Sequence, residues 1–532
     1  MTRFDVDVVV VGAGFAGLYS AYKARTEGWS VVGIEAAPEV GGTWFWNRYP
    51  GARCDVESLD YSYSFDEELQ REWRWSERYA TQPEILSYIK HVADRFDLRR
   101  HFRFETRVTQ ARFDDDASRW VVRTDAGQEY RARFLLLATG SLSAPKVPDI
   151  AGFEDFAGEV YMTSSWPQTD PDVSGKRVGV IGTGSSGIQV IPVLAAQAEH
   201  LTVFQRSPNF SVPAFNRELD DEEWEQALAA YPERRRTSWA GGAGSPHTSH
   251  PGDPLTMTDE ERREVLEEFW QRGGVLFGKT FANQTIDPRI NEFARQFAEE
   301  RIREIVQDPA VADDLVPTDH PIGTKRICTD SGYFETFNRD DVTLVNLRKD
   351  PIDTITPWGI KTDQGSHELD VLVLATGFDA MTGALTRIDI EGPRGHRIAD
   401  AWSGGPLTYL GMAIPGFPNM FSLSGAGSPS VLANMVLTGE QQVNWLVDLI
   451  HHCDEHGHTQ VEARLDAAEA WGSHVDEVAS KTLFVGANSW YMGANVEGKA
   501  RGFMPYLGGF ATYGALCDEA RDEGYAGFVL GS

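Results

Sequence analysis

The feature that most constrains this chain is a glycine-rich loop that occurs twice, each time between a β-branched run and a helical pattern. The first copy has glycines at Gly12, Gly14 and Gly17; it follows the valine-rich run 6–11 and leads into a helix and strand over 18–34. In a G-x-G-x-x-G loop the glycines allow a tight turn, close approach of a pyrophosphate and close helix–strand packing. The pattern predicts a parallel sheet with a nucleotide at the helix N-terminus.

The second copy follows the strand pattern 177–181 and leads into a helix and a strand over 201–205. Its phosphate-facing residues are expected to be Gly182, Thr183, Gly184, Ser185, Ser186, Gly187, Ile188 and Gln189. The chain therefore holds two nucleotide-binding units.

The two units differ at the end of their second strand. Glu35 closes the first one, where a carboxylate accepts ribose hydroxyls and repels a 2′-phosphate, so this unit binds FAD or NAD, with FAD favoured. Gln205 and Arg206 close the second one, and a guanidinium beside a neutral amide suits a 2′-phosphate. We assign NADPH to the second unit; the alternative is that Arg206 is an ordinary solvated cation.

The expected fold class is α/β, with two doubly wound, Rossmann-like nucleotide-binding domains and a helical insertion. The strands 134–138 and 371–375 each precede Ala-Thr-Gly and return the chain to its own sheet. The predicted divisions are 1–144 for the first part of the FAD domain, 145–212 for the first part of the NADPH domain, 213–318 for the helical insertion, 319–378 for the second part of the NADPH domain, and 379–532 for the second part of the FAD domain with a C-terminal segment.

Charge and cysteine content exclude several classes of protein. The formal charge of −30 would repel nucleic acid and anionic membranes, so we expect neither as a partner. No run of 18 apolar residues is present, and we expect the N-terminal apolar stretch to be a strand and not a signal peptide. The four cysteines form no C-x-x-C pair, which favours a reducing, cytoplasmic location. The sequence predicts no oligomeric state.

Two dinucleotides without a redox-active dithiol restrict the chemistry. NADPH reduces a flavin, and the electrons must then leave to something other than a protein disulfide. Dioxygen is the obvious acceptor.

A longer segment points to a family. The residues Phe156-Ala-Gly158-Glu-Val-Tyr-Met162-Thr-Ser-Ser-Trp166-Pro167 resemble the fingerprint F-x-G-x-x-x-H-x-x-x-W-P of Baeyer-Villiger monooxygenases, with Met162 where the family has His. The segments GGTWFWNRYPGARCDVES, GTKR, ATGFDAMTGAL, GSPSVLANM and SWYMGANVEGK resemble the same family in the same order. The chain is most similar to the phenylacetone and cyclohexanone members of this class of flavoprotein monooxygenases.

The resemblance implies an activity. NADPH reduces FAD, dioxygen adds to form a flavin C4a-peroxide, and its anion attacks a ketone. The tetrahedral (Criegee) adduct then rearranges to an ester or lactone. A small ketone and O₂ are thus the expected partners.

The resemblance also implies site residues. Arg326 matches the catalytic arginine, and Asp55 matches the carboxylate that orients it and contacts the flavin region. Lys325 and Ser207 join Arg206 at the 2′-phosphate, and Trp490 touches the nicotinamide cofactor. The flavin contacts are Phe15, Thr43, Trp44, Tyr61, Val108 and Met435, and residues 430–432 lie beside the substrate pocket. Taken without the resemblance, these are equally ordinary core, turn or solvated residues.

Other interpretations stay open. A heteroatom oxygenase would make sulfoxides or N-oxides, and a flavin-binding redox sensor or uncoupled NADPH oxidase would release hydrogen peroxide. A histidine cluster (His451, His452, Cys453, His456 and His458) contains one i, i+4 pair, but Gly457 marks a helix end. A solvated helix terminus is favoured there, and we expect no metal.

Overall fold

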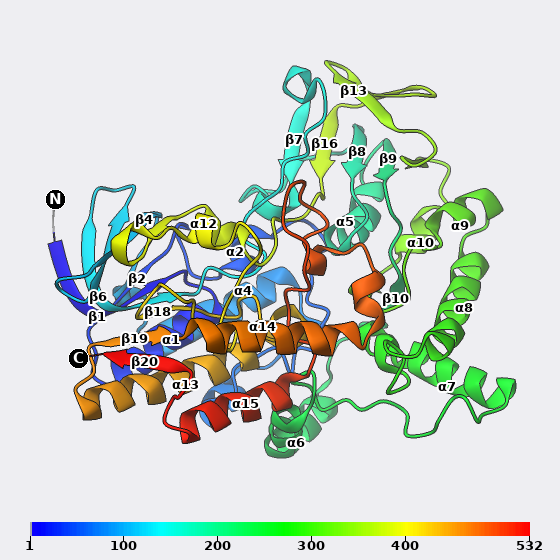
Figure 1. The fold of residues 1–532 in the computed structure, drawn as a ribbon. Helices are drawn as coiled ribbons and strands as arrows, with labels where there is room; N and C mark the ends of the chain where they lie inside the picture. Colours follow the sequence, from blue (N-terminus) through cyan, green and yellow to red (C-terminus); the bar gives the residue numbers. More distant parts are fainter. Residues whose placement is uncertain (1–2, 532) are drawn as a thin grey trace.

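The structure is a computed structural model that describes residues 3–531. Two largely parallel sheets lie in separate halves of the molecule, with helices packed around and beside them (Figure 1). In the part of the chain that is described, no helix is long and apolar enough to span a membrane.

The larger sheet has eight strands in the order β17-β4-β5-β6-β1-β2-β3, with β18 paired to β6. At its centre β1 (Arg3–Val11) runs parallel to β2 (Val31–Ile34) and β6 (Glu129–Leu137). Val8 and Val10 point into one buried core and Val9 and Val11 into another, which explains the nearly continuous valine run. The other strands are β3 (Phe102–Arg103), β4 (Val108–Asp114), β5 (Arg119–Thr124), β17 (Asp389–Glu391) and β18 (Met420–Ser422).

Helices from both ends of the chain cover one face of this sheet. The first glycine loop opens α1 (Phe15–Thr26), which packs on the long helix α13 (Met435–His456). A Cβ at Gly439 would lie 3.4 Å from the Ala16 Cβ, so the two helices approach closely there. The neighbouring elements are α2 (Thr43–Trp46), α3 (Glu67–Glu72), α4 (Gln82–Arg95), β19 (Gln460–Ala463), α14 (Leu465–Ser480), α15 (Phe510–Asp522) and β20 (Phe528–Gly531).

The second sheet has five parallel strands in the order β12-β9-β8-β16-β7. The central strand β8 (Arg177–Ile181) leads through the second glycine loop into α5 (Ser185–Ala195). Its partners are β7 (Glu159–Met162), β9 (His200–Gln205), β12 (Val342–Asn346) and β16 (Val371–Leu374). A separate antiparallel sheet of β13 (Ile352–Thr356), β14 (Gly359–Thr362) and β15 (Ser366–Glu368) follows β12.

The helical segment predicted at 213–318 lies between two short parallel strands, β10 (Ser211–Pro213) and β11 (Cys328–Asp330). It contains α6 (Asp221–Ala240), α7 (Asp259–Arg272), α8 (Pro288–Ile305) and α9 (Pro309–Leu315), followed after β11 by α10 (Tyr333–Thr336). Helices α7 and α8 share an apolar core. In contrast α6 lies against α15 (Figure 1). It also contacts the segment 60–70, where buried Arg235 donates to Ser62 Oγ (2.6 Å) and Gln70 Oε1 (3.0 Å). Helix α6 thus packs on different elements from α7 and α8.

Candidate active site

The outer glycines of both loops are required by close backbone contacts. Gly12 has φ +106°, and a Cβ there would lie 2.5 Å from the Ala138 carbonyl oxygen. Gly182 has φ +111°, and its Cβ would lie 2.4 Å from the Ala375 oxygen. At Gly17 and Gly187 a Cβ would lie 1.9 Å and 2.2 Å from the oxygen of the first glycine in the same loop. These four glycines set the turn and the helix–strand packing.

The middle glycines have a different environment. A Cβ at Gly184 would meet nothing within 4 Å, and one at Gly14 would meet only the Gly42 Cα, at 3.6 Å. Both residues have negative φ, so neither the backbone nor the neighbours require glycine. The space that a Cβ would fill lies at a helix N-terminus, which is the place for a pyrophosphate. Both loops therefore fit a dinucleotide.

Glu35 lies at the first loop. Its buried carboxylate accepts hydrogen bonds from the backbone amides of Ala13 (2.6 Å) and Ala37 (2.7 Å). Burial raises the pKa of Glu35, and these amides oppose that shift. The carboxylate is thus fixed beside the loop.

Asp55 and Arg326 are paired although they lie far apart in the sequence. Arg326 donates from Nε to Asp55 Oδ2 (2.5 Å) and from Nη2 to Oδ1 (2.7 Å), a bidentate arrangement. Its Nη1 donates to the Val431 carbonyl oxygen (2.7 Å). Burial lowers the pKa of Arg326, but Asp55 more than offsets this and the net pKa lies above the usual value. The guanidinium is therefore a fixed, permanent cation.

The turn that holds Val431 also contains the predicted pocket residues 430–432. Ser430 has φ +44°, a left-handed conformation that is costly for a residue with a side chain. Its hydroxyl donates to the Ser424 carbonyl oxygen (2.8 Å) and lies 2.9 Å from Ser141 Oγ. The strained turn is held in place beside Arg326.

Three predicted flavin contacts form one aromatic group. The centroid of the Tyr61 ring lies 5.3 Å from that of Phe15 and 5.8 Å from that of Trp44. Both ring pairs are packed edge to face. Trp44 Nε1 also donates to Tyr61 Oη (3.2 Å). Thr43 begins α2 beside Trp44, and Met435 begins α13 and packs in the apolar cluster of Val431.

The residues predicted for the 2′-phosphate lie at the end of the second sheet. Arg206 is exposed, and Ser207 accepts a hydrogen bond at its carbonyl from Thr183 Oγ1 (3.0 Å). Lys325 Nζ lies 3.6 Å from Asp319. Burial lowers the pKa of Lys325, Asp319 opposes this shift, and Arg348 and Arg206 add to it.

Two residues of this group were missed by the sequence analysis. Arg348 donates to Ser207 Oγ (2.9 Å) and pairs with Asp319. Arg348 follows β12, which is parallel to β9, so its position after an adjacent parallel strand was the available signal. No local sequence pattern indicated a role for Asp319.

Trp490 packs beside the Asp55–Arg326 pair through Tyr491, which sequence reasoning also missed. The Trp490 and Tyr491 rings lie 4.2 Å apart, and both belong to the apolar cluster that contains Val431. Burial raises the pKa of Tyr491 to about 12, against the opposing effect of Arg326. Tyr491 is thus neutral at physiological pH.

Three of the predicted residues make structural contacts within the protein. Val108 packs in the core on the opposite face of the large sheet from Phe15. Gln189 donates to the Arg53 carbonyl oxygen (2.9 Å) and accepts from Tyr49 Oη (2.8 Å), so it links the two halves of the molecule. Gln205, expected beside the 2′-phosphate, is buried and donates to the Asp314 carbonyl oxygen (2.7 Å). The neighbouring Arg206 is exposed.

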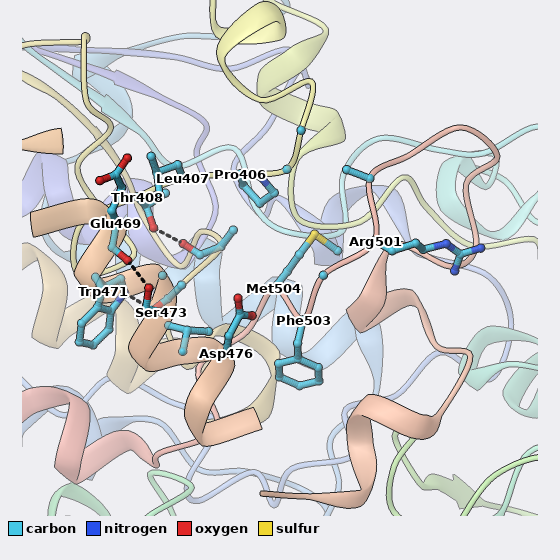
Figure 2. Close-up of a pocket in the computed structure, with 18 residues that line it drawn as sticks. Pro406, Leu407, Thr408, Glu469, Trp471, Ser473, Asp476, Arg501, Phe503 and Met504 are labelled. Atoms are coloured by element: carbon cyan, nitrogen blue, oxygen red, sulfur yellow. Dashed lines mark hydrogen bonds between the residues drawn. The ribbon is translucent and has the colours of Figure 1, made fainter. Parts of the chain in front are cut away.

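A cavity of about 430 Å³ lies between α14, the loop 404–408 and the segment 500–504 (Figure 2). Trp471 in its wall donates from Nε1 to the Gly427 carbonyl oxygen (3.1 Å). Met504 lines this cavity and also belongs to the apolar cluster that contains Met381 and Trp490. The cavity is therefore adjacent to the site, but Asp55 and Arg326 do not line it.

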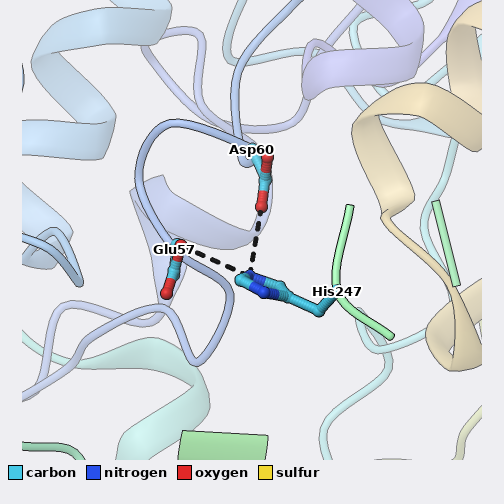
Figure 3. Close-up of side chains that lie close together, drawn as sticks. All are labelled: Glu57, Asp60 and His247. Atoms are coloured by element: carbon cyan, nitrogen blue, oxygen red, sulfur yellow. Dashed lines mark ion pairs between the residues drawn. The ribbon is translucent and has the colours of Figure 1, made fainter. Parts of the chain in front are cut away.

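Glu57, Asp60 and His247 gather close to one another (Figure 3). Arg234 donates to Asp60 Oδ1 (2.6 Å) and Glu57 Oε2 (2.7 Å), and Arg78 also pairs with Glu57. Burial would raise the pKa of Glu57, but His247 and the two arginines bring it below its usual range. Since guanidinium groups already neutralise the carboxylates, this cluster is an ion-pair network, to which we assign no metal.

Comparisons with known proteins place the chain in a family. A family model described as "Pyridine nucleotide-disulphide oxidoreductase" matches residues 6–230. A protein of Pseudooceanicola batsensis named Baeyer-Villiger monooxygenase is 42% identical over 99% of this chain and 96% of its own length.

Solved structures agree with this match over the whole chain. A steroid monooxygenase bound to NADP is 54% identical, with a TM-score of 0.95 and 99% of each chain covered. The OTEMO complex with FAD and NADP is 40% identical, with a TM-score of 0.95 and 99% of each chain covered.

Proposed function

This chain belongs to the Baeyer-Villiger monooxygenase family, and from that premise we propose that it oxidises ketones to esters or lactones with NADPH, FAD and dioxygen. The observation that carries the proposal is the bidentate Asp55–Arg326 pair, which couples a fixed cation to the flavin-side half of the molecule. A permanent positive charge at this position suits a reaction in which negative charge develops on oxygen.

The two loops would hold the two cofactors. The loop of Gly12, Gly14 and Gly17 would bind FAD, with Phe15 and Glu35 beside it. The loop at 182–189 would bind NADPH, with Arg206, Ser207 and Lys325 at the 2′-phosphate. When bound, NADPH supplies a hydride and FAD accepts it and activates dioxygen.

Arg326 would stabilise the anionic oxygen of the reacting groups. Its guanidinium cannot release its proton and presents several donors in a fixed plane. Asp55 would orient the guanidinium by accepting two hydrogen bonds, and the Val431 carbonyl oxygen accepts a third, from Nη1. Because this pair is partly buried, its electrostatic effect is larger than in water.

Apolar groups around the pair would exclude water. Val431, Tyr491 and Phe503 are all buried and belong to one cluster with Trp490. A dry environment protects reactive groups from hydrolysis and strengthens the field of Arg326. The Ser430 turn would present this wall to the ketone.

We propose a broad range of ketone sizes as candidate substrates. A structure 54% identical to this chain is named a steroid monooxygenase, so polycyclic ketones are included with small cyclic, linear and aryl ones as candidate substrates.

We also propose the domain divisions 1–144, 145–212, 213–318, 319–378 and 379–532. Since the four buried cysteines are thiols, we propose a cytoplasmic location.

Product analysis tests the proposal. The purified FAD-loaded enzyme is given NADPH, air and each ketone, and NADPH consumed is compared with ester, hydrogen peroxide and, for sulfide or amine substrates, S- or N-oxide formed. We expect ester or lactone in nearly equal amount to NADPH for at least one ketone. Sulfoxide or N-oxide alone would favour a heteroatom oxygenase, and peroxide alone an NADPH oxidase.

A further inference from the structure

Three imidazoles gather at the end of α13, outside the active site. His452 and His456 share one face of the helix, and their ring centroids are 4.2 Å apart. Gly457, with φ +72°, turns the chain so that the His458 ring lies 6.0 Å from His456 and 6.3 Å from His452. The helix ends at His456 in an exposed turn, as the sequence predicted, and the three rings cluster together there.

The hydrogen bonds of these rings leave nitrogen atoms free. His456 Nδ1 donates to the His452 carbonyl oxygen (2.8 Å), which places the proton on Nδ1 and leaves the Nε2 lone pair available. Metal-binding histidines are usually held in this way, with the second ring nitrogen donating to a carbonyl or carboxylate. His458 Nδ1 is shielded from solvent and has no hydrogen-bond partner among the described residues.

Two of the nearby carboxylates are engaged elsewhere, while Glu455 forms no ion pair in residues 3–531. Asp454 pairs with Arg133, and Glu27 pairs with His451, which lies outside the cluster. No carboxylate in residues 3–531 forms an ion pair with His452, His456 or His458.

We propose that His452, His456 and His458 form a binding site for one divalent transition-metal ion of the class preferred by imidazole: Zn²⁺, Ni²⁺ or Cu²⁺. Histidines spaced i, i+4 on a helix can supply two ligands to one ion. With Zn–N distances of about 2.0–2.1 Å, rings on one tetrahedral ion have centroids roughly 5 Å apart. The helical pair must open slightly and His458 must rotate inward, with water completing the coordination.

The site would act on structure and not on catalysis. A bound ion would join the C-terminal turn of α13 to the segment entering β19, which pairs antiparallel with β20 at the C-terminal end of the chain. Binding to the folded state alone stabilises that state. The inference does not depend on the proposed reaction.

Zinc titration of the FAD-loaded full-length protein tests the site. After treatment with EDTA and buffer exchange, Zn²⁺ binding is measured by calorimetry and thermal unfolding is measured with and without Zn²⁺. We expect one ion per chain and a higher thermal midpoint with Zn²⁺. In His452→Gln and His456→Gln the affinity should fall at least tenfold and the shift in thermal midpoint should disappear, with a smaller loss in His458→Gln.

Two matched variants serve as controls. His451→Gln removes a neighbouring helix histidine that pairs with Glu27, and His247→Gln removes the histidine of the Glu57–Asp60 network. Both should bind Zn²⁺ as the wild type does. Unchanged binding in His452→Gln and His456→Gln, loss of binding in His247→Gln, or no saturable binding in the wild type would overturn the site. Equal thermal midpoints without Zn²⁺ show that the variants fold.

Discussion

Alanine substitutions at two glycines of the second loop separate ligand recognition from folding. Gly184 has φ −83° and ψ −167°, a conformation open to alanine, and its Cβ would meet nothing within 4 Å. As the N-cap residue before α5, alanine is worse than glycine by roughly 0.5–1 kcal/mol. Reduced flexibility of the unfolded chain offsets this by about 0.4–1 kcal/mol. Gly184→Ala should therefore change stability by less than about 1 kcal/mol.

Gly187→Ala should behave differently. Its Cβ would lie 2.2 Å from the Gly182 carbonyl oxygen, a backbone atom that cannot rotate away. Helix α5 must shift relative to β8, and overpacking of this kind costs about 1–3 kcal/mol or more. We expect a lower thermal midpoint for this variant.

NADPH binding and thermal unfolding are measured for both variants. In Gly184→Ala the new methyl group occupies the space assigned to the pyrophosphate, so the Kd for NADPH should rise at least tenfold, or about 1.4 kcal/mol, with a wild-type thermal midpoint. Gly14→Ala in the first loop is the matched case and should lower FAD content instead. If Gly184→Ala bound NADPH as tightly as the wild type, the second loop would not hold the pyrophosphate.

Three further results are expected. Arg206→Ala should weaken NADPH much more than NADH, since only NADPH carries the 2′-phosphate; titration with both nucleotides checks this, and equal losses would contradict it. Met162→His, in the edge strand β7, should raise the ester formed per NADPH; a variant equal to the wild type would make this a packing position only. Burial raises the pKa of Asp330 to about 6, so its ionisation destabilises the fold by about 3 kcal/mol as pH rises from about 4 to 6. Asp330→Asn should remove that pH dependence, and its thermal midpoint should exceed that of the wild type at pH 8 but not near pH 4; equal midpoints at pH 8 would refute this.

Local patterns predicted the nucleotide-binding units well because their signals lie within short segments. The strand expected at 6–11 is part of β1, and the helix expected at 18–27 is α1, which begins at Phe15. Both glycine loops have the backbone that their spacing predicts. The Asp55–Arg326 pairing could not follow from local patterns, because only the complete fold brings these residues together; it came from the family resemblance.

Several side-chain contacts depend on tertiary packing and could not be predicted from the sequence. Helix α6 is polar on most of its surface, so its sequence does not reveal that buried Arg235 joins it to the segment near Gln70. Gln205 closes a strand as expected but turns inward to the Asp314 carbonyl oxygen. The ring contacts of His458 with His452 and His456 likewise depend on the turn at Gly457.

The most direct test of the central claim is rapid-mixing kinetics with product analysis on Arg326→Ala. NADPH should still reduce the bound FAD, because the glycine loops are unchanged. Ester formation should fall below detection, because no fixed cation remains to stabilise negative charge on oxygen. Ester formed at the wild-type rate would contradict the assigned role of Arg326.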